Sequence, residues 1–526
     1  MKARRFLAVV LTVTLVLLGL GVGAWWMTWQ RSPLQLQHQA LSMPRAARFV
    51  PRDAPFSAHL LADPEQPLAY ARAVAPVRQR RQAVEAVAGL RDGAFAAAGL
   101  DYIDELANWL GDETSLWMFQ GDPAKPVGWV LALSSRDGDG ARRFLQRFWQ
   151  TRSLAGTDLQ ISNYRGMGLI SGRGALVGEE PVPLATALID DDLVLLASGR
   201  GVLEQSLDVS QIDALNQASD PQLQQRIQSV AHGALVLTAQ PDVFQGSLLG
   251  PLSPSLHSIM VALRPEGRDL VVDGWLDPGP SVVPWPVANS QRAMPLLDAL
   301  QGEATALAVL QAPGQWPAPW PAAMQALIRQ GSTEDLGPVP ALVLDTTEGS
   351  LLWRQDEDGW LLGTASEQPD RDQLAQGLAA MGLVSAPLEV EGDVLEVWTR
   401  FLLGRDRPRD DGGPDQLVVS LAAASSVQDG WTWWANSIQT LRQQRQGHAQ
   451  PRALTERLET LELPEASLRW VASAEPAQAL LHQWSAWRVL SALAGVPLAP
   501  PVDGMALALQ PDQKDVRVRA RLSYGR

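Results

Sequence analysis

The chain contains no cysteine, which excludes disulfide bonds, cysteine-ligated metal sites and thiol nucleophiles. Lysine is nearly absent as well, since it occurs only at Lys2, Lys125 and Lys514, so the basic residues are almost all arginine. The formal net charge of -14 argues against nucleic acid as a partner. What remains is a chain of 526 residues, 46% of them hydrophobic, which is long enough for about two to four ordinary domains.

Catalytic and cofactor motifs are also missing. The six histidines include no pair at the spacing of metal ligands, and there is no Gly-x-Ser-x-Gly elbow, Walker loop, Ser-x-x-Lys or dinucleotide fingerprint. Asp137 and Asp139 resemble the start of a calcium loop, but the glutamate that closes such a loop is not in place. The other interpretation is a strand-to-helix turn in which Asp139 caps a helix starting near Ala141. No cofactor or metal is expected.

The N-terminus carries one long apolar run. Three basic residues precede an uncharged segment, Phe6–Trp29, which as a helix would reach about 36 Å and cross a bilayer. Its far end holds the residues expected at the membrane interface, Trp25, Trp26 and Trp29. Positive residues stay on the cytoplasmic side, so this segment predicts a single-pass signal anchor with the N-terminus inside and the body outside. A cleaved signal peptide ending at Val22–Ala24 is the alternative.

The rest of the chain divides at two segments that disfavour regular structure. After an anchor of residues 1–30, residues 31–42 are polar with scattered proline and suit a short stalk. Residues 281–290 lie in a stretch dense in proline and glycine, which indicates a linker. The first folded unit is then expected to cover residues 43–280, and the second residues 291–526.

The two units resemble each other. ALRPEGRDLVVDGWL (Ala262–Leu276) matches ALQPDQKDVRVRARL (Ala508–Leu522) at an offset of 246 residues, and each segment predicts a hairpin. GWVLALSS (Gly128–Ser135) matches GWLLGTAS (Gly359–Ser366), and a helix is expected after each. Two looser matches keep the same order, so we expect a tandem duplication.

Both units mix short alternating strands with amphipathic helices, and tight polar turns join several strands into hairpins. The fold class is therefore expected to be α+β, with one N-terminal transmembrane helix followed by two tandem duplicated units of mainly antiparallel sheet with packed helices. The copies differ on one face of the last strand, where Arg517, Arg519 and Arg521 replace Val271, Asp273 and Trp275. We expect Trp275 to be more covered than Arg521.

Two segments are candidate surfaces for a partner or ligand. In DGWTWWANSIQTLRQQR a helix would place a stripe of apolar residues toward the core and leave Trp433 off that face. The other segment is APVRQRRQAVEAVAGLR, where Arg78, Arg80 and Arg81 occur in an otherwise acidic protein. A solvated helix face is one interpretation of these arginines, and contact with lipid headgroups or an acidic partner is the other.

Several motifs point to a known family. FVPRDAPFSAHLLADP, GLDYIDELANWLGDE, GWVLALSSRD and TALIDDDLVLLAS lie in the part of the chain where the similarity is strongest, Phe49–Leu207. Together they resemble a family of cyanobacterial membrane-anchored proteins that is filed as a domain of unknown function. The resemblance implies a location in the periplasm or the thylakoid lumen, and it implies no catalytic residues.

These observations favour a non-enzymatic binding or assembly module at the membrane, whose partners would be other membrane or extracytoplasmic proteins. Two alternatives from other classes stay open: a hydrolase using a carboxylate pair between the two units, and a lipid or pigment carrier with a Trp-lined groove. A flat apolar patch would favour the binding module. A cleft with two close, partly buried carboxylates would favour the hydrolase, and a long dry pocket the carrier.

Overall fold

The computed structural model describes residues 32–525 apart from several segments. Those segments are residues 121–126, 155, 157, 178–179, 242–255, 280–293, 318–319, 322–324, 326–336, 405–415, 448–449, 464 and 513. The expected anchor with Trp25, Trp26 and Trp29 lies outside the described residues, and so does the expected linker at 281–290.

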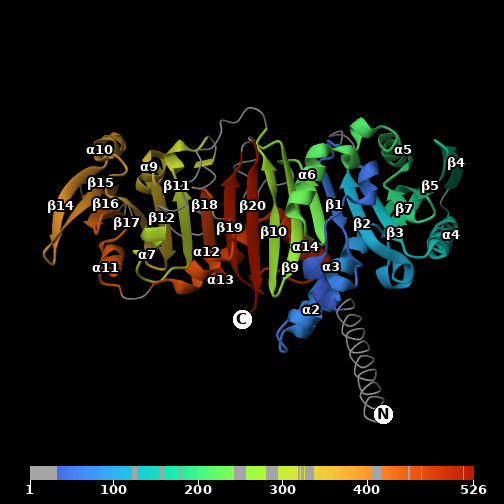
Figure 1. Cartoon of the computed structure of the whole chain (residues 1–526), viewed down its shortest axis with the longest axis horizontal. Helices are drawn as coiled ribbons and strands as arrows, with labels where there is room; N and C mark the ends of the chain where they lie inside the picture. The colour runs from blue at the N-terminus through green and yellow to red at the C-terminus, as the bar shows by residue number, and fades with distance from the viewer. Residues whose placement is uncertain are drawn as a thin grey trace, which may run out of the picture.

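All strands of the described part belong to one antiparallel sheet of twenty strands (Figure 1). The strands before residue 280 are β1 (Phe56–Leu60), β2 (Leu110–Met118), β3 (Trp129–Ser135), β4 (Asp158–Tyr164), β5 (Met167–Val177), β6 (Glu180–Ile189), β7 (Leu193–Ala197), β8 (Leu235–Ala239), β9 (Ser258–Glu266) and β10 (Asp269–Asp277). Those after it are β11 (Ala306–Gln311), β12 (Ser350–Asp356), β13 (Gly359–Ala365), β14 (Val384–Val390), β15 (Asp393–Gly404), β16 (Gln416–Gln428), β17 (Trp431–Ala435), β18 (Leu468–Ser473), β19 (Val502–Pro511) and β20 (Val516–Tyr524).

The strand order repeats itself. From one end of the sheet, neighbouring strands run β4, β5, β6, β7, β3, β2, β1, β8, β9 and β10. From the other end they run β14, β15, β16, β17, β13, β12, β11, β18, β19 and β20, so each strand of the second series is ten places after its counterpart. We call the two series the first and second repeat. They join at the centre, where β10 pairs with β20.

The expected fold class is wrong in how the two units are organised. The repeats do not form two separate sheets, because the β10–β20 ladder makes them one continuous sheet. In the described part of the chain, which does not include the expected anchor, no helix is long and apolar enough to span a membrane. The antiparallel pairing and the packed helices are as expected, but the organisation is a single duplicated sheet.

Helices cover both faces of this sheet. They are α2 (Gln66–Val74), α3 (Arg80–Ala96), α4 (Gly138–Leu154), α5 (Arg200–Val209), α6 (Pro221–Val230), α7 (Met294–Asp298), α9 (Pro338–Thr346), α10 (Arg371–Ala380), α11 (Ile438–Gln446), α12 (Arg452–Glu459), α13 (Ala474–Gln483) and α14 (Ser485–Ala494). Alternation along each strand supplies the two cores. On β3, for example, Leu133 packs with Phe148 of α4, whereas Ala132 packs with Leu207 of α5.

The strand–helix units expected after GWVLALSS and GWLLGTAS are confirmed as β3–α4 and β13–α10. The residues expected to form a stalk lie against the body instead of extending from it. Within Pro33–His38, a 3-10 helix, Leu36 is buried, and Ala40 makes a bridge to His232. The first repeat therefore has additional packed structure before β1.

Candidate functional site

The centre of the sheet joins equivalent strands of the two repeats. β10 and β20 pair antiparallel from Asp269–Ser523 to Leu276–Val516. Arg519 lies 246 positions after Asp273, which is the offset between the matching sequences, and these two residues are also direct partners in the ladder. A pseudo-twofold axis therefore passes between Asp273 and Arg519.

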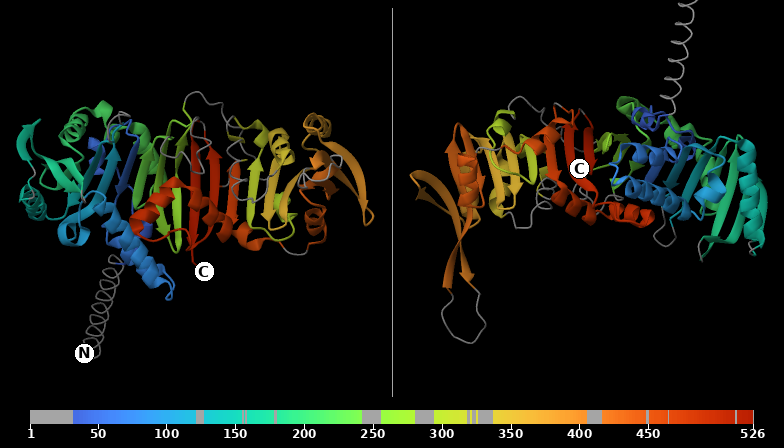
Figure 2. Two further views of the ribbon diagram at one scale, coloured as in Figure 1. Left: turned by 180° about the vertical axis from the view of Figure 1, so that it is seen from behind. Right: turned by 90° about the horizontal axis from the view of Figure 1, so that it is seen from below.

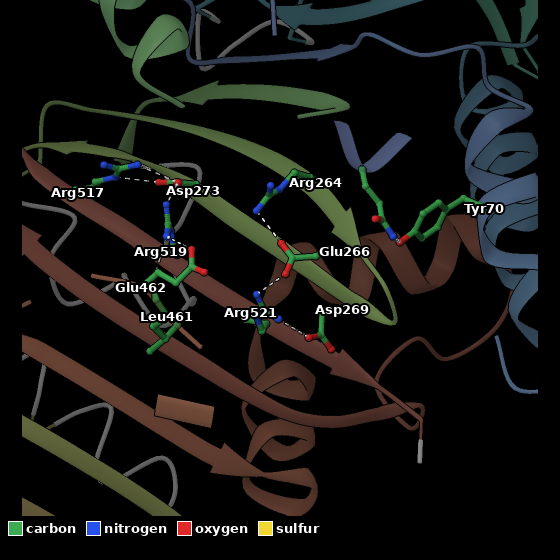
Figure 3. Close-up of polar contacts among 11 residues, drawn as sticks. Tyr70, Arg264, Glu266, Asp269, Asp273, Leu461, Glu462, Arg517, Arg519 and Arg521 are labelled. Atoms are coloured by element: carbon green, nitrogen blue, oxygen red, sulfur yellow. Dashed lines mark hydrogen bonds and ion pairs between the residues drawn. The ribbon is translucent and has the colours of Figure 1, made fainter. Parts of the chain in front are cut away.

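Asp273 is the acidic centre of this junction (Figure 3). Its carboxylate accepts hydrogen bonds from Arg517 Nη2 at 3.1 Å and from Arg519 Nη2 at 2.6 Å. The side chains of Asp273, Arg517 and Arg519 are only 13%, 27% and 17% exposed, so water screens their charges weakly. Arg519 also lies 3.3 Å from Glu462, which follows α12.

Arg521 extends the same array toward the β9–β10 turn. Its guanidinium donates to Asp269 Oδ2 at 2.8 Å and to Glu266 Oε1 at 2.9 Å. Burial by itself would lower the pKa of Arg521, but the hydrogen bonds and charges of Asp269 and Glu266 outweigh burial and raise this pKa. Arg521 and Trp275 are both partly buried.

We call these six residues the charged seam: Glu266, Asp269 and Asp273 of the first repeat, and Arg517, Arg519 and Arg521 of the second. Each of its carboxylates is held by an arginine of the opposite repeat. Within the described residues, no three His, Asp or Glu side chains gather so that they could hold a metal ion. The seam is an array of ion pairs that joins the two repeats.

Contacts outside the seam also join the repeats. Arg226 of α6 lies 3.0 Å from Asp515, just before β20. On another side of the molecule, α3 packs on α14 so closely that a Cβ added at Gly93 would lie 1.9 Å from the Leu493 carbonyl oxygen. Glycine permits this approach because it has no side chain.

Sequence reasoning placed the three arginines on one face of a strand but did not find the seam. Arg517, Arg519 and Arg521 alternate along one strand and therefore share a face. Asp269 and Asp273 likewise share a face of β10, so the sequence contains both charged faces of the seam. The missing information was that β10 and β20 are neighbours.

A second candidate surface lies at the end of the sheet, where β14, β15 and β16 form an arm that extends beyond the helices (Figure 2). Phe401 lies opposite Val419, and Val384 lies opposite Thr399, two residues before Phe401 on β15. Strand alternation therefore puts Val384, Leu388, Phe401 and Val419 on one face. They are 52%, 38%, 54% and 57% exposed, and we call them the arm face.

The arm face continues the core. Leu395 and Val397 lie on the same face of β15, where they are buried with Leu441 of α11. Two residues further along, Thr399 is partly buried, and at Phe401, four residues further along, the cover has ended and the side chain is 54% exposed. An apolar face that runs out from under its covering helix is typical of a binding surface.

The family of the chain is shown by its sequence. A family model described as "Protein of unknown function (DUF3352)" matches residues 9–311. This chain belongs to the DUF3352 family. The DUF3352 match takes in all ten strands of the first repeat and ends with β11, the first strand of the second repeat. The family assignment agrees with the expected resemblance to a family of unknown function, and it supplies no activity.

Comparisons with other proteins add little to the DUF3352 assignment. No curated protein matches the chain. Among solved structures, crystal form I of TP0453 is similar with 9% identity and a TM-score of 0.27, over 46% of this chain and 81% of that chain. Crystal form III of TP0453 has 9% identity and a TM-score of 0.25, over 48% and 86%. At these TM-scores the similarity carries no argument about the DUF3352 chain.

The residues proposed from the sequence as partner surfaces lie in different repeats. Trp433 is fully buried in strand β17, next to Gly363, so it is not available to an external partner. Arg78, Arg80 and Arg81 are exposed at the start of α3, and Arg81 forms an ion pair with Glu85. The structure does not bring these arginines and Trp433 together.

A buried polar network in the first repeat contains the side chains of a hydrolytic triad. Ser57 Oγ lies 3.2 Å from His59 Nε2, His59 Nδ1 lies 2.8 Å from Ser115 Oγ, and that hydroxyl donates to Glu113 at 3.4 Å. All four side chains are buried, so no substrate can reach them. Burial lowers the pKa of His59 to about 4, and the ring is therefore neutral at pH 7.

A cavity among the described residues bears on the hydrolase alternative. An open cavity of about 590 Å³ beside α11 is lined by Glu303, Asp356, Glu357, Asp358 and Arg442, among others. This cavity lies within the second repeat, whereas the hydrolase alternative requires a carboxylate pair between the two units. Burial raises the pKa of Asp356, but this carboxylate is bound by Arg354 at 2.6 Å, and Asp358 accepts a hydrogen bond from Gln443. Both carboxylates are therefore engaged by neighbouring side chains of the second repeat.

The calcium alternative at the start of α4 has similar obstacles. Asp137 accepts a hydrogen bond from the Asp139 backbone N–H and forms an ion pair with Arg143 at 3.0 Å. Asp139 forms an ion pair with Arg142 at 2.9 Å. The helix begins at Gly138, so Asp137 and not Asp139 supplies the capping side chain.

Proposed function

We propose that this protein is a non-enzymatic binding module that engages a partner protein through the arm face. The observation that carries this proposal is the exposed apolar surface of Val384, Leu388, Phe401 and Val419, which continues a buried core past its covering helix. The proposal includes the location outside the cytoplasm that the sequence indicates, and the partner is to be sought there.

The size of the arm face suits a contact with a few dominant residues. Complete burial of a valine, leucine or phenylalanine side chain contributes about 1.5–3 kcal/mol, and these side chains are already partly covered. Each one therefore adds about 1 kcal/mol on binding. Replacing Phe401 and Val419 with serine should weaken a complex by roughly 10- to 100-fold. The substitutions should leave the fold intact because both side chains are more than half exposed.

The chain offers a matched control at the opposite end of the sheet. β4 is the counterpart of β14 at the other edge, and its Ile161 is 81% exposed. Ile161→Ser removes a similar amount of exposed apolar surface from a place that the proposal does not use. A general effect of surface polarity would appear in both variants.

Site-specific photocrosslinking of the full chain in its own cells tests the proposal. A photoreactive residue at Thr399, beside Phe401 on the arm face, should give one reproducible adduct with a defined protein. The adduct should disappear in Phe401→Ser/Val419→Ser and persist in Ile161→Ser. The proposal is wrong if Thr399 gives no adduct, or if the adduct survives the loss of both arm residues.

A further inference from the structure

The turn between α2 and α3 combines exposed apolar and basic side chains. Val77 lies in this turn and is 81% exposed. Arg72, Arg78, Arg80 and Arg81 surround it in sequence, and all four are exposed. We call these five residues the basic tip.

Little negative charge opposes the basic tip. The ion pair to Glu85 reaches only Arg81, whose side chain is 91% exposed, so water screens that pair strongly. Arg78 and Arg80 form no ion pair with any described residue. A fifth arginine lies close by, because Gln79 packs against Gly525, and the Gly525 carbonyl accepts a hydrogen bond from Arg268. This concentration of positive charge belongs to a chain whose net charge is -14.

The basic tip is held in place by the rest of the fold. Tyr70 of α2, labelled in Figure 3, lies near the β9–β10 turn. Its hydroxyl donates a hydrogen bond to the Gly267 carbonyl in this turn at 2.9 Å and accepts one from Gln37 Nε2 at 2.7 Å. On its other side, α3 packs on α14 through Gly89 and Gly93. The two helices therefore present the tip at a fixed position near the C-terminal end of β20 (Figure 1).

We propose that the basic tip binds the surface of an anionic lipid bilayer. Guanidinium groups form paired hydrogen bonds with phosphate, and an aliphatic side chain between them can enter the boundary between headgroups and acyl chains. The exposed Val77 suits a bilayer, because its side chain can leave water while the neighbouring guanidinium groups stay at the headgroups. The acidic remainder of the chain is repelled by the same surface, so contact at the tip also orients the molecule. This surface is separate from the arm face and does not depend on it.

The absence of cysteine makes a local test simple. In full-length Val77→Cys, a polarity-sensitive fluorophore reports on the tip alone, whatever other parts of the chain do. The probes are phosphatidylcholine vesicles with and without phosphatidylglycerol. The fluorophore emission should shift to the blue only with phosphatidylglycerol, and added salt should reverse this shift.

Arginine variants of the labelled chain test the assignment of charge. Each arginine near an anionic surface contributes about a fivefold factor, so Arg78→Gln/Arg80→Gln/Arg81→Gln should weaken the fluorescence response to vesicles roughly 100-fold. The matched control replaces three other exposed arginines that have no ion pair with a described residue, Arg371, Arg400 and Arg452. It changes the net charge equally and should bind vesicles like the parent.

Three results would overturn the proposal. One is an emission that is the same with both kinds of vesicle. Another is an equal loss in the control variant, which would make net charge the cause. The third is a blue shift with an acidic polypeptide but not with anionic vesicles, which would assign the tip to a protein partner.

Discussion

Reversal of charge at Asp273 perturbs the seam at the pseudo-twofold axis. In Asp273→Arg, a third guanidinium would face Arg517 and Arg519, which are 27% and 17% exposed and now bind the Asp273 carboxylate at 3.1 and 2.6 Å. The substitution removes these charge-assisted hydrogen bonds and adds repulsion between like charges. Arg519→Asp creates the reverse defect, because it places two carboxylates face to face.

The structure sets the size of the effect. A hydrogen bond to a charged group contributes about 1.5–3 kcal/mol, and partial exposure of the arginines reduces this value through solvent screening. We expect each single substitution to lower the free energy of unfolding by about 3 kcal/mol. Asp273 and Arg519 are equivalent positions facing each other, so Asp273→Arg/Arg519→Asp restores an ion pair across the axis. The double variant should therefore be more stable than either single variant.

Urea unfolding followed by tryptophan fluorescence measures the three free energies, and a double-mutant cycle isolates the coupling between the two positions. We expect a coupling energy of at least about 2 kcal/mol in favour of opposite charges. If the double variant loses as much as the sum of the singles, or each single loses under about 0.5 kcal/mol, the seam does not depend on this pair.

Two further predictions concern packing and pH. Gly93→Ala should lower the free energy of unfolding by about 2 kcal/mol, because its Cβ would lie 1.9 Å from the Leu493 carbonyl oxygen. Gly201→Ala in α5, where nothing lies within 4 Å, should be neutral or stabilising, and urea unfolding measures both. Burial lowers the pKa of His59 from its ordinary value of 6.5 to about 4, so the unfolded chain binds this proton more readily. Its neutral form stabilises the fold above pH 6.5, and about 3 kcal/mol should be lost as the pH falls to about 4. Urea unfolding of the parent and of His59→Gln across this pH range measures the loss, which the variant should not show. If both proteins lose the same free energy of unfolding between pH 6.5 and pH 4, His59 is not its source.

The duplication and the local elements of the fold could be read from the sequence, but the single sheet could not. Alternation in Asp269–Asp277 and Val516–Tyr524 predicts two strands, and the offset of 246 residues predicts that they are equivalent. Neither pattern predicts that the edge of the first repeat at β10 pairs with the edge of the second repeat at β20. The charge complementarity between Asp273 and Arg519 becomes visible only when the two strands are placed side by side.

The segment around Trp433 shows a different reason for failure. Trp431, Trp434, Ile438 and Leu441 have helical spacing, but Trp431 and Trp434 belong to β17, and α11 begins at Ile438. Strand alternation puts Trp434 and Trp433 in the cores on opposite faces of the sheet. The helix expected there is wrong because Trp and Thr favour a strand and Ser437 caps the helix that follows.

The exposed arginines and the arm face also differ in what the sequence reveals. Arg78, Arg80 and Arg81 stand out as a cluster of charge in the sequence, and the structure leaves them exposed. Phe401 and Val419 look like core residues, because their pattern continues that of Leu395 and Val397. Only the position at which α11 stops covering the strands separates the exposed pair from the buried pair.

Hydrogen exchange of the intact chain tests the central claim most directly, namely that the two repeats form one sheet joined at β10 and β20 with open edges at β4 and β14. Peptides from Asp269–Asp277 and Val516–Tyr524 should exchange slowly, like other interior strands, because both are paired on each side. Peptides from Asp158–Tyr164 and Val384–Val390 should exchange faster, because each of these strands has one described neighbour. Exchange at β10 and β20 as fast as at β4 and β14 would contradict the continuous sheet.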